Sequence, residues 1–156
     1  MTLHFLGIGA QKAGTTWLFE KLREHPSLSF PGGKEVHFWD THSDRGLNWY
    51  RGLFAVQDGK MHGDITPRYA ILPPESIKAC HAAFPDLKLI FTIRNPVDRA
   101  WSAAKMALRQ AGRTVEQTSP DWFLREVMRQ DSLARGDYES CIRNWLNRKL
   151  PRQVDS

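Results

Sequence analysis

The segment from Phe5 to Leu18 constrains the fold more than any other part of the 156-residue chain. Its apolar start, Phe5–Gly9, is typical of a short buried strand, and Thr15–Glu24 has the pattern of a helix that stops before Pro26. A turn with glycines and a lysine joins the two. Such a turn directs backbone N–H groups and the positive helix N-terminus at one point. The segment therefore predicts an α/β fold with an anion-binding loop.

This turn differs from the loop that binds ATP. Gly9 and Gly14 have the GxxxxG spacing, but Thr15 stands where the ATP-type loop has its lysine. The lysine is Lys12, whose charge can still reach a bridging phosphate oxygen, and the hydroxyls of Thr15 and Thr16 can donate to phosphate oxygens. A tight glycine turn with an exposed lysine would explain the bare spacing equally well. The strand–loop–helix context favours anion binding.

Strand-like and helix-like segments alternate along the rest of the chain. Leu87–Ile93 is the clearest further strand, and Met61–Ile65 is a weaker one. Residues 27–33 are expected to form a loop, and Val36–Trp39 a short extended piece. This alternation predicts a mostly parallel sheet covered by helices, in a single domain over residues 1–156. The expected helices are Leu47–Leu53, Pro73–Phe84, Pro96–Gln110, Pro120–Gln130 and Tyr138–Lys149.

Composition and charge narrow the class of protein. No stretch approaches the ~18 apolar residues of a membrane span, and no signal peptide is recognisable, so a cytoplasmic protein without a membrane partner is expected. Cys80 and Cys141 have no CxxC spacing and are expected to be reduced and buried. The net charge is +5, and residues 94–156 carry 12 basic against 8 acidic residues. That excess suits an anionic ligand, although a solvated basic surface would explain it too.

The second predicted strand ends in Arg94, where a nucleoside triphosphatase usually has an aspartate that helps to hold magnesium. An arginine cannot hold a metal, but it can bind a phosphate group through two hydrogen bonds. Ser102, eight residues on, could add a hydroxyl from the following helix, and Arg99 is a further cation. The sequence thus predicts two anion sites at neighbouring strand ends and no metal. A salt bridge with Asp98 is the alternative for Arg94.

These motifs together resemble those of the sulfotransferases. Gln11–Trp17 is similar to their 5′-phosphosulfate loop, and Ile93–Ser102 to their 3′-phosphate motif. Three further segments resemble the Golgi heparan-sulfate branch and its bacterial relatives: Lys34–Asp40, Gly63–Tyr69 and Asp137–Trp145. The resemblance covers nearly the whole chain. It implies a P-loop-NTPase-like fold, 3′-phosphoadenylyl sulfate (PAPS) as the sulfuryl donor, 3′-phosphoadenosine 5′-phosphate (PAP) as the product, and no metal.

The resemblance also implies a role for individual donor-site residues. Arg94 and Ser102 would hold the 3′-phosphate, which distinguishes this donor from ATP. Trp17 would flank the adenine, with a place in the core as its alternative. The 5′-phosphosulfate would be held by Lys12, Ala13, Gly14, Thr15 and Thr16, of which Lys12 would also stabilise charge on the bridging oxygen.

On the acceptor side, the resemblance implies that Glu35 is the base that takes the proton from an acceptor hydroxyl or amine. His37 is the alternative base, and on an extended segment both side chains could face one cleft. Alternatively, both residues would be ordinary polar residues at the protein surface. The acceptor would be a small molecule or a glycan, and nucleic acid is not expected as a partner. A metal site at His37, Asp40 and His42 matches no known ligand spacing.

Two departures from the family affect these expectations. Ile65 stands where some heparan-type members carry a lysine, so a heparan-like acceptor does not follow from the resemblance. The chain also ends at Pro151–Ser156, where the next strand of the family is expected to begin. We therefore expect a truncated domain with an open sheet edge, which could support a homo-oligomer. A catalytically silent domain that binds nucleotide or a partner chain is the alternative function.

Overall fold

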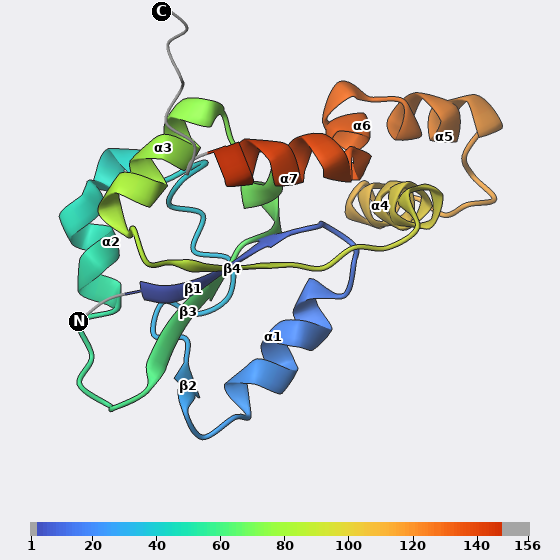
Figure 1. Ribbon diagram of the computed structural model, residues 1–156. Coiled ribbons are helices and arrows are strands. Elements are labelled where there is room, and N and C mark those ends of the chain that lie inside the picture. The colour runs from blue at the N-terminus through green and yellow to red at the C-terminus, as the bar shows by residue number, and fades with distance from the viewer. Residues whose placement is uncertain (1–2, 148–156) are drawn as a thin grey trace, which may run out of the picture.

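The computed structural model describes residues 3–147, in which four strands form one sheet in the order β2-β3-β1-β4. All three pairings are parallel, and β1 lies between β3 and β4 (Figure 1). The strands are β1 (Leu3–Gly9), β2 (Leu28–Ser29), β3 (Met61–Ile65) and β4 (Lys88–Phe91). The predicted α/β class with a parallel sheet is confirmed.

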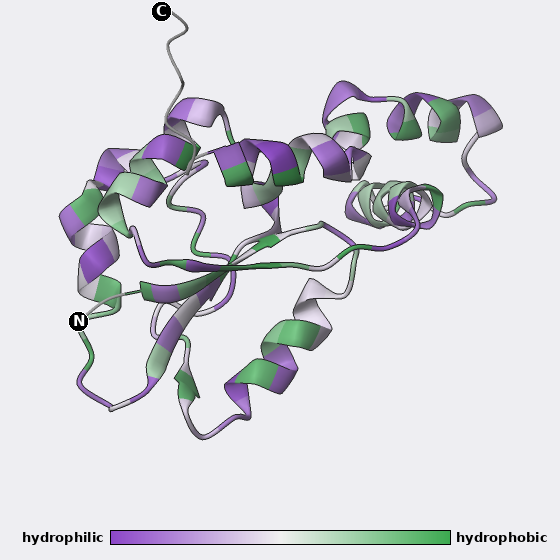
Figure 2. Ribbon diagram, viewed as in Figure 1, coloured by the Kyte–Doolittle hydropathy of each residue, from purple (hydrophilic) through white to green (hydrophobic). Residues whose placement is uncertain are grey.

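Helices cover both faces of this sheet. Figure 1 shows α1 on one face, α2, α3 and α7 on the other, and α4 to α6 beyond the carboxyl ends of the strands. The α-helices are α1 (Thr15–Arg23), α2 (Leu47–Leu53), α3 (Pro74–Ala83), α4 (Pro96–Gln110), α5 (Pro120–Val127), α6 (Gln130–Gly136) and α7 (Tyr138–Leu146). The 3-10 helices are η1 (Ser43–Arg45) and η2 (Pro67–Ile71). In Figure 2 these helices carry both hydrophobic and hydrophilic residues, as helices that cover a sheet must.

The side chains of β1 alternate between two packed layers. Phe5 packs edge-on against Phe30, which in turn meets Phe19 of α1. Leu6 and Ile8 enter the main core on the opposite face, together with residues of α2, α3 and α7. This core contains Trp39, Tyr50, Phe54, Tyr69, Ile77, Cys80 and Trp145. Burial from both faces fixes the central strand, and with it the loop that follows Gly9.

Three segments differ from the sequence-based expectation. The helix expected over Pro120–Gln130 ends at Val127, because Arg129 has extended backbone angles, and a separate helix, α6, begins at Gln130. Strand β2 lies within the expected loop 27–33 and is too short to show a pattern. The segment Val36–Trp39 is a turn rather than an extended piece.

The remaining predictions can be compared only with the residues that the structure describes. Strand β4 pairs only with β1 among residues 3–147, and the end of the last predicted helix and Pro151–Ser156 lie outside that part. A homo-oligomer through this edge stays a prediction. Both cysteines are buried, as expected, and no disulfide joins them. None of the helices within residues 3–147 is both long enough and apolar enough to cross a membrane.

A pair of glycine substitutions tests this packing. A Cβ added at Gly63 in β3 would overlap the ring of Phe5, whereas one added at Gly52 in α2 would meet no atom within 4 Å. We expect Gly63→Ala to lower the free energy of unfolding by about 1–3 kcal/mol, because the Phe5 ring must move. Gly52→Ala should raise it by about 0.5–1 kcal/mol, because alanine favours the helix. Urea unfolding measures both, and an unchanged Gly63→Ala midpoint would contradict the packing described.

Candidate functional site

A cavity of about 560 Å³ opens at the carboxyl ends of the strands, where parallel α/β sheets place their ligand sites. Its walls come from the loop after β1, the segment before η1, the start of η2, the segment after β4, and helices α1, α4 and α6. The residues that line it are Gln11, Lys12, Gly14, Thr15, Thr16, Glu35, His37, Pro67, Arg68, Arg94, Ser102, Met106, Gln110 and Arg135.

The loop after β1 is built to receive an anion. Its first residue is tied to the end of β4, since Ala10 N donates to Thr92 O at 2.7 Å and Thr92 N to Gly9 O at 2.8 Å. Gly14 has the left-handed φ of 85° and precedes the first helical residue of α1. No side chain caps this helix end, so the N–H groups of its first turn face the cavity without a helical partner.

Lys12 stands in this loop among other cations. Partial burial, followed by the positive charges of Arg109 and Arg94, lowers the pKa of Lys12; Lys105 and Lys34 add smaller effects. Four neighbouring cations around one partly buried ammonium group create a strongly positive end of the cavity. Such a potential attracts a polyanion.

Arg94 points at the same loop. Its Nη1 donates to Lys12 O at 3.4 Å, so the guanidinium lies at the cavity instead of pairing with Asp98. Tyr138 of α7 holds the Arg94 backbone in place, because its hydroxyl donates to Arg94 O at 2.7 Å. Ser102 reaches the cavity from the second turn of α4. The two predicted anion sites therefore share one cavity.

Two predicted donor-site residues lie elsewhere. Ala13 does not line the cavity, and its N–H is used within the loop, where it donates to Ala10 O at 3.1 Å. Trp17 is 67% exposed and lies outside the cavity wall, so the core alternative for this residue is wrong. A contact between Trp17 and the adenine stays a prediction.

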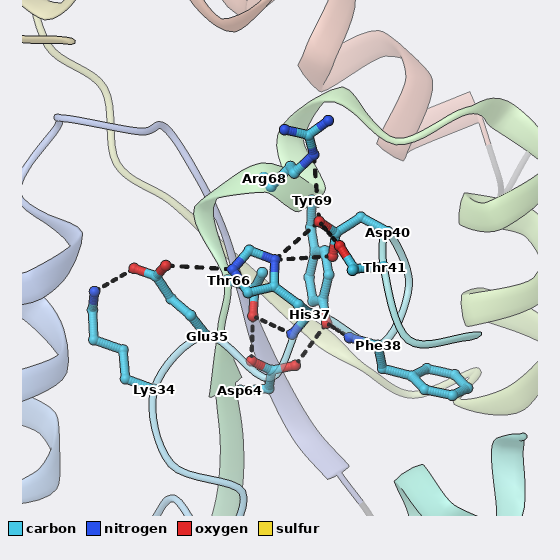
Figure 3. Close-up of polar contacts among 10 residues, drawn as sticks. All are labelled: Lys34, Glu35, His37, Phe38, Asp40, Thr41, Asp64, Thr66, Arg68 and Tyr69. Carbon is cyan, nitrogen blue, oxygen red and sulfur yellow. Dashed lines mark hydrogen bonds and ion pairs between the residues drawn. The ribbon is translucent and has the colours of Figure 1, made fainter. Parts of the chain in front are cut away.

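Glu35 and His37 face the cavity together, although not for the reason expected. They have positive φ angles of 60° and 56°, and this sharp bend brings His37 Nε2 to 3.5 Å from Glu35 Oε2 (Figure 3). The other oxygen of Glu35 contacts Lys34 Nζ. On the far side of the imidazole, Nδ1 lies 2.9 Å from Asp40 Oδ2. The carboxylate of Glu35 is therefore held from two sides at the cavity wall.

A buried carboxyl group fixes the bend. Asp64 is fully buried at the end of β3, and burial raises its pKa against the opposing effect of the hydroxyls that donate to it. Thr66 donates to Oδ1 at 2.7 Å, and Tyr50 and Tyr69 donate to Oδ2 at 2.8 and 3.1 Å. The Tyr69 hydroxyl in turn accepts from Phe38 N at 2.9 Å (Figure 3). This network attaches the segment that carries Glu35 to the sheet.

The geometry agrees with a comparison against known families. The profile described as "Sulfotransferase domain" matches residues 4–155 of the chain. The chain belongs to the sulfotransferase domain family. The resemblance that the two anion motifs suggested is thereby confirmed.

Three relatives illustrate the extent of the similarity. Heparan sulfate glucosamine 3-O-sulfotransferase 6 of Mus musculus is 45% identical over 96 residues, which are 61% of this chain and 28% of that protein. Bifunctional heparan sulfate N-deacetylase/N-sulfotransferase 1 of Mus musculus is 27% identical over 164 aligned positions, covering 94% of this chain and 19% of that protein. The crystal structure of a sulfotransferase from Alicyclobacillus acidocaldarius superposes with a TM-score of 0.68 at 26% identity, covering 94% of this chain and 69% of that chain. This chain thus spans under a third of the curated relatives.

Sequence reasoning missed several residues of the sulfotransferase cavity. Arg68 lies inside the Gly63–Tyr69 motif, but it occupies the variable position of that motif, so the resemblance implied no role for it. Arg135 lies on α6, which was not predicted as a separate helix. Ile65, in contrast, is fully buried in the core, so its place does not present a side chain to the cavity. Met106 and Gln110 of α4 were also missed, whereas Gln11 and Pro67 lie within motifs named above but were given no role there.

No metal-ligand set assembles from these side chains. Within residues 3–147, no group of three or more His, Cys, Asp or Glu side chains lies close enough to hold a metal ion. His37 and Asp40 are paired, with Nδ1 of the imidazole 2.9 Å from Asp40 Oδ2.

Removing one hydroxyl tests how the bend is held. Tyr69→Phe leaves the buried Phe38 N–H without its acceptor and removes one donor to Asp64, which should lower the free energy of unfolding by about 1–3 kcal/mol. Tyr50→Phe also removes a donor to Asp64 but leaves the Phe38 contact intact, so it is the matched control. We expect amide hydrogen exchange over residues 35–40 to accelerate at least tenfold in Tyr69→Phe and to change little in Tyr50→Phe. Equal protection in both variants would contradict this attachment.

Proposed function

We propose that this chain transfers a sulfuryl group from PAPS to a hydroxyl or amine of a glycan or small-molecule acceptor. The observation that carries the proposal is the shared cavity, in which an uncapped helix end with Lys12 lies beside Arg94 and Ser102, and Glu35 forms the adjoining wall. Family membership supports sulfuryl transfer, and the cavity supports a donor with two anionic groups.

The residues present fit such a donor. The free N–H groups at the start of α1, together with Lys12 and the hydroxyls of Thr15 and Thr16, would hold the 5′-phosphosulfate. Arg94 and Ser102 would hold the 3′-phosphate. When bound, PAPS supplies the activated sulfuryl group. The unpartnered helix end, which lacks a side-chain cap, supports this assignment because it is available to an anion.

Transfer then needs a base for the acceptor proton and a cation that stabilises the charge on the departing donor. Glu35 would accept the proton from the acceptor, and its carboxylate is steadied by Lys34 and by His37. Both ring nitrogens of His37 face carboxylates, Nδ1 towards Asp40 and Nε2 towards Glu35, which leaves neither turned to the acceptor and supports a positioning role for the imidazole. Lys12 would stabilise the negative charge that develops on the bridging oxygen.

The printed names of the relatives bear on the acceptor. One is a glucosamine 3-O-sulfotransferase and another contains an N-sulfotransferase, so both hydroxyl and amine acceptors occur among similar proteins. Both act on heparan sulfate by name. We extend only the chemical class, a glycan hydroxyl or amine, to this chain.

Donor binding is testable without an acceptor. Calorimetry in the absence of magnesium should detect PAP binding at least tenfold tighter than ADP, because ADP lacks the 3′-phosphate. Lys12→Ala and Arg94→Ala should each weaken PAP about 10- to 100-fold, the effect of losing a charged hydrogen bond. Lys21→Ala, an exposed lysine of α1 paired with Glu24, is the control and should bind normally. ATP binding that requires magnesium and ignores Arg94→Ala would instead indicate a kinase-like enzyme.

A substitution of Glu35 distinguishes donor binding from sulfuryl transfer. Glu35→Gln should bind PAP at least as tightly as the parent chain, since it removes a negative charge from the cavity. With radiolabelled PAPS and a set of glycan acceptors, it should lose transfer at least 100-fold. The matched control is Glu75→Gln, an exposed glutamate of α3 far from the cavity. Full transfer by Glu35→Gln would exclude Glu35 as the base.

A further inference from the structure

The cavity contains a second group of cations that the donor does not explain. Arg68 at the start of η2 and Arg135 on α6 both line its wall. Neither corresponds to the loop or to the 3′-phosphate motif. Their environment indicates what they bind.

Arg135 is a buried charge without a partner. The residue is only 7% exposed, and within residues 3–147 its guanidinium has no hydrogen-bond or ion-pair partner. Burial first, and then the charge of Arg68, lowers the pKa of the Arg135 guanidinium. A buried guanidinium is costly unless an anion accepts from it, and this one lines the wall of the cavity.

The acidic groups nearby do not neutralise this pair. Arg68 Nε lies 3.4 Å from Asp40 Oδ2, but Asp40 also binds the imidazole of His37. Asp131, beside Arg135 on α6, is 3.5 Å from Arg129 Nε. Behind the helix, Arg99 is buried and donates to Ser132 O, which adds to the positive potential. An excess of positive charge is therefore left at this wall.

This second group is separate from the donor cations. Lys12 lies in the loop between β1 and α1 and Arg94 in the segment after β4, whereas Arg68 lies on η2 and Arg135 on α6.

Glu35 links the two ends of the cavity. It contacts Lys34, whose charge acts on Lys12, and His37, whose other nitrogen binds Asp40, the partner of Arg68 (Figure 3). The proposed base thus lies between the donor cations and the Arg68–Arg135 pair, where the reacting hydroxyl or amine belongs.

We propose that Arg68 and Arg135 form an anion subsite for the acceptor, which binds a sulfate or carboxylate group near the hydroxyl or amine that is sulfated. The inference rests on the proposed function and narrows its acceptor to acidic molecules. Two guanidinium groups suit planar or tetrahedral oxyanions, which accept paired hydrogen bonds from each. A neutral glycan would leave Arg135 buried and unpaired.

The test uses the PAP-saturated full chain and two hexasaccharides of equal length. An N-sulfated heparosan hexasaccharide carries sulfates and carboxylates, and chitohexaose is neutral. Calorimetry at fixed ionic strength should detect the acidic probe and at least tenfold weaker binding of the neutral one. Arg68→Gln and Arg135→Gln should each weaken the acidic probe at least tenfold and change PAP affinity less than threefold. Arg125→Gln, an exposed arginine of α5, removes the same charge outside the cavity and should change neither.

Each outcome decides between the two proposals. If Arg135→Gln unfolds, as thermal melting would reveal, the half-exposed Arg68→Gln decides alone. PAP binding with equal affinity for the two probes, or acidic binding unaffected by Arg68→Gln, would overturn the subsite and leave the donor proposal standing. Failure to bind PAP would overturn the proposed function, and the acceptor subsite with it.

Discussion

The site depends on one buried carboxyl group. Asp64 is fully buried at the end of β3, and a carboxyl group in that position is tolerated only when its oxygens are hydrogen-bonded. Three hydroxyls meet this requirement, and they come from α2, η2 and the residue that follows the strand. Tyr69 extends the network in two directions, since its hydroxyl binds Phe38 N and its carbonyl accepts from Trp145 Nε1 at 3.0 Å. One buried group thereby joins the sheet to α7 and to the segment that carries Glu35.

Local sequence chemistry was enough to predict the end of the cavity that carries Lys12 and Arg94. The order of strand, glycine turn and helix at residues 5–24 left few alternatives, because buried β1 fixes where the loop emerges and glycine permits its left-handed residue. Arg94 was predictable for the same reason, since it directly follows the strand beside β1. Both signals are contained in short segments, and the parallel pairing of β1 with β4 brings the segments together.

The acceptor side needed information that local patterns do not contain. Glu35 and His37 were found by resemblance, but the extended backbone assumed for them was wrong, because hydrogen bonds to residues distant in the sequence hold the bend: Glu35 N donates to Ile65 O and Phe38 N to the Tyr69 hydroxyl. Arg135 was missed because α6 is a single short helix whose one large apolar residue, Leu133, is half-exposed. The position of Arg135 results from the packing of α6 against α4, and no sequence pattern near residue 135 predicts that packing.

The structure gathers part of the positive charge of the chain in one cavity. The overall excess of +5 indicates only a preference for anions. In the structure, four cations from separate elements line one cavity: Lys12, Arg68, Arg94 and Arg135. Only Glu35 among the cavity-lining residues opposes them with a full negative charge. A cavity with this balance would bind a doubly anionic donor and still leave positive charge for the acceptor.

The central claim is that the two anionic groups of the donor occupy two different places in one cavity. Phosphorus NMR of PAP tests it directly, because the 5′- and 3′-phosphates give separate resonances. On titration with the protein, both resonances should shift and broaden with one common affinity. Lys12→Ala should reduce the shift of the 5′-phosphate more than that of the 3′-phosphate, and Arg94→Ala should do the reverse. Perturbation of a single resonance, or identical effects of the two substitutions, would contradict the account.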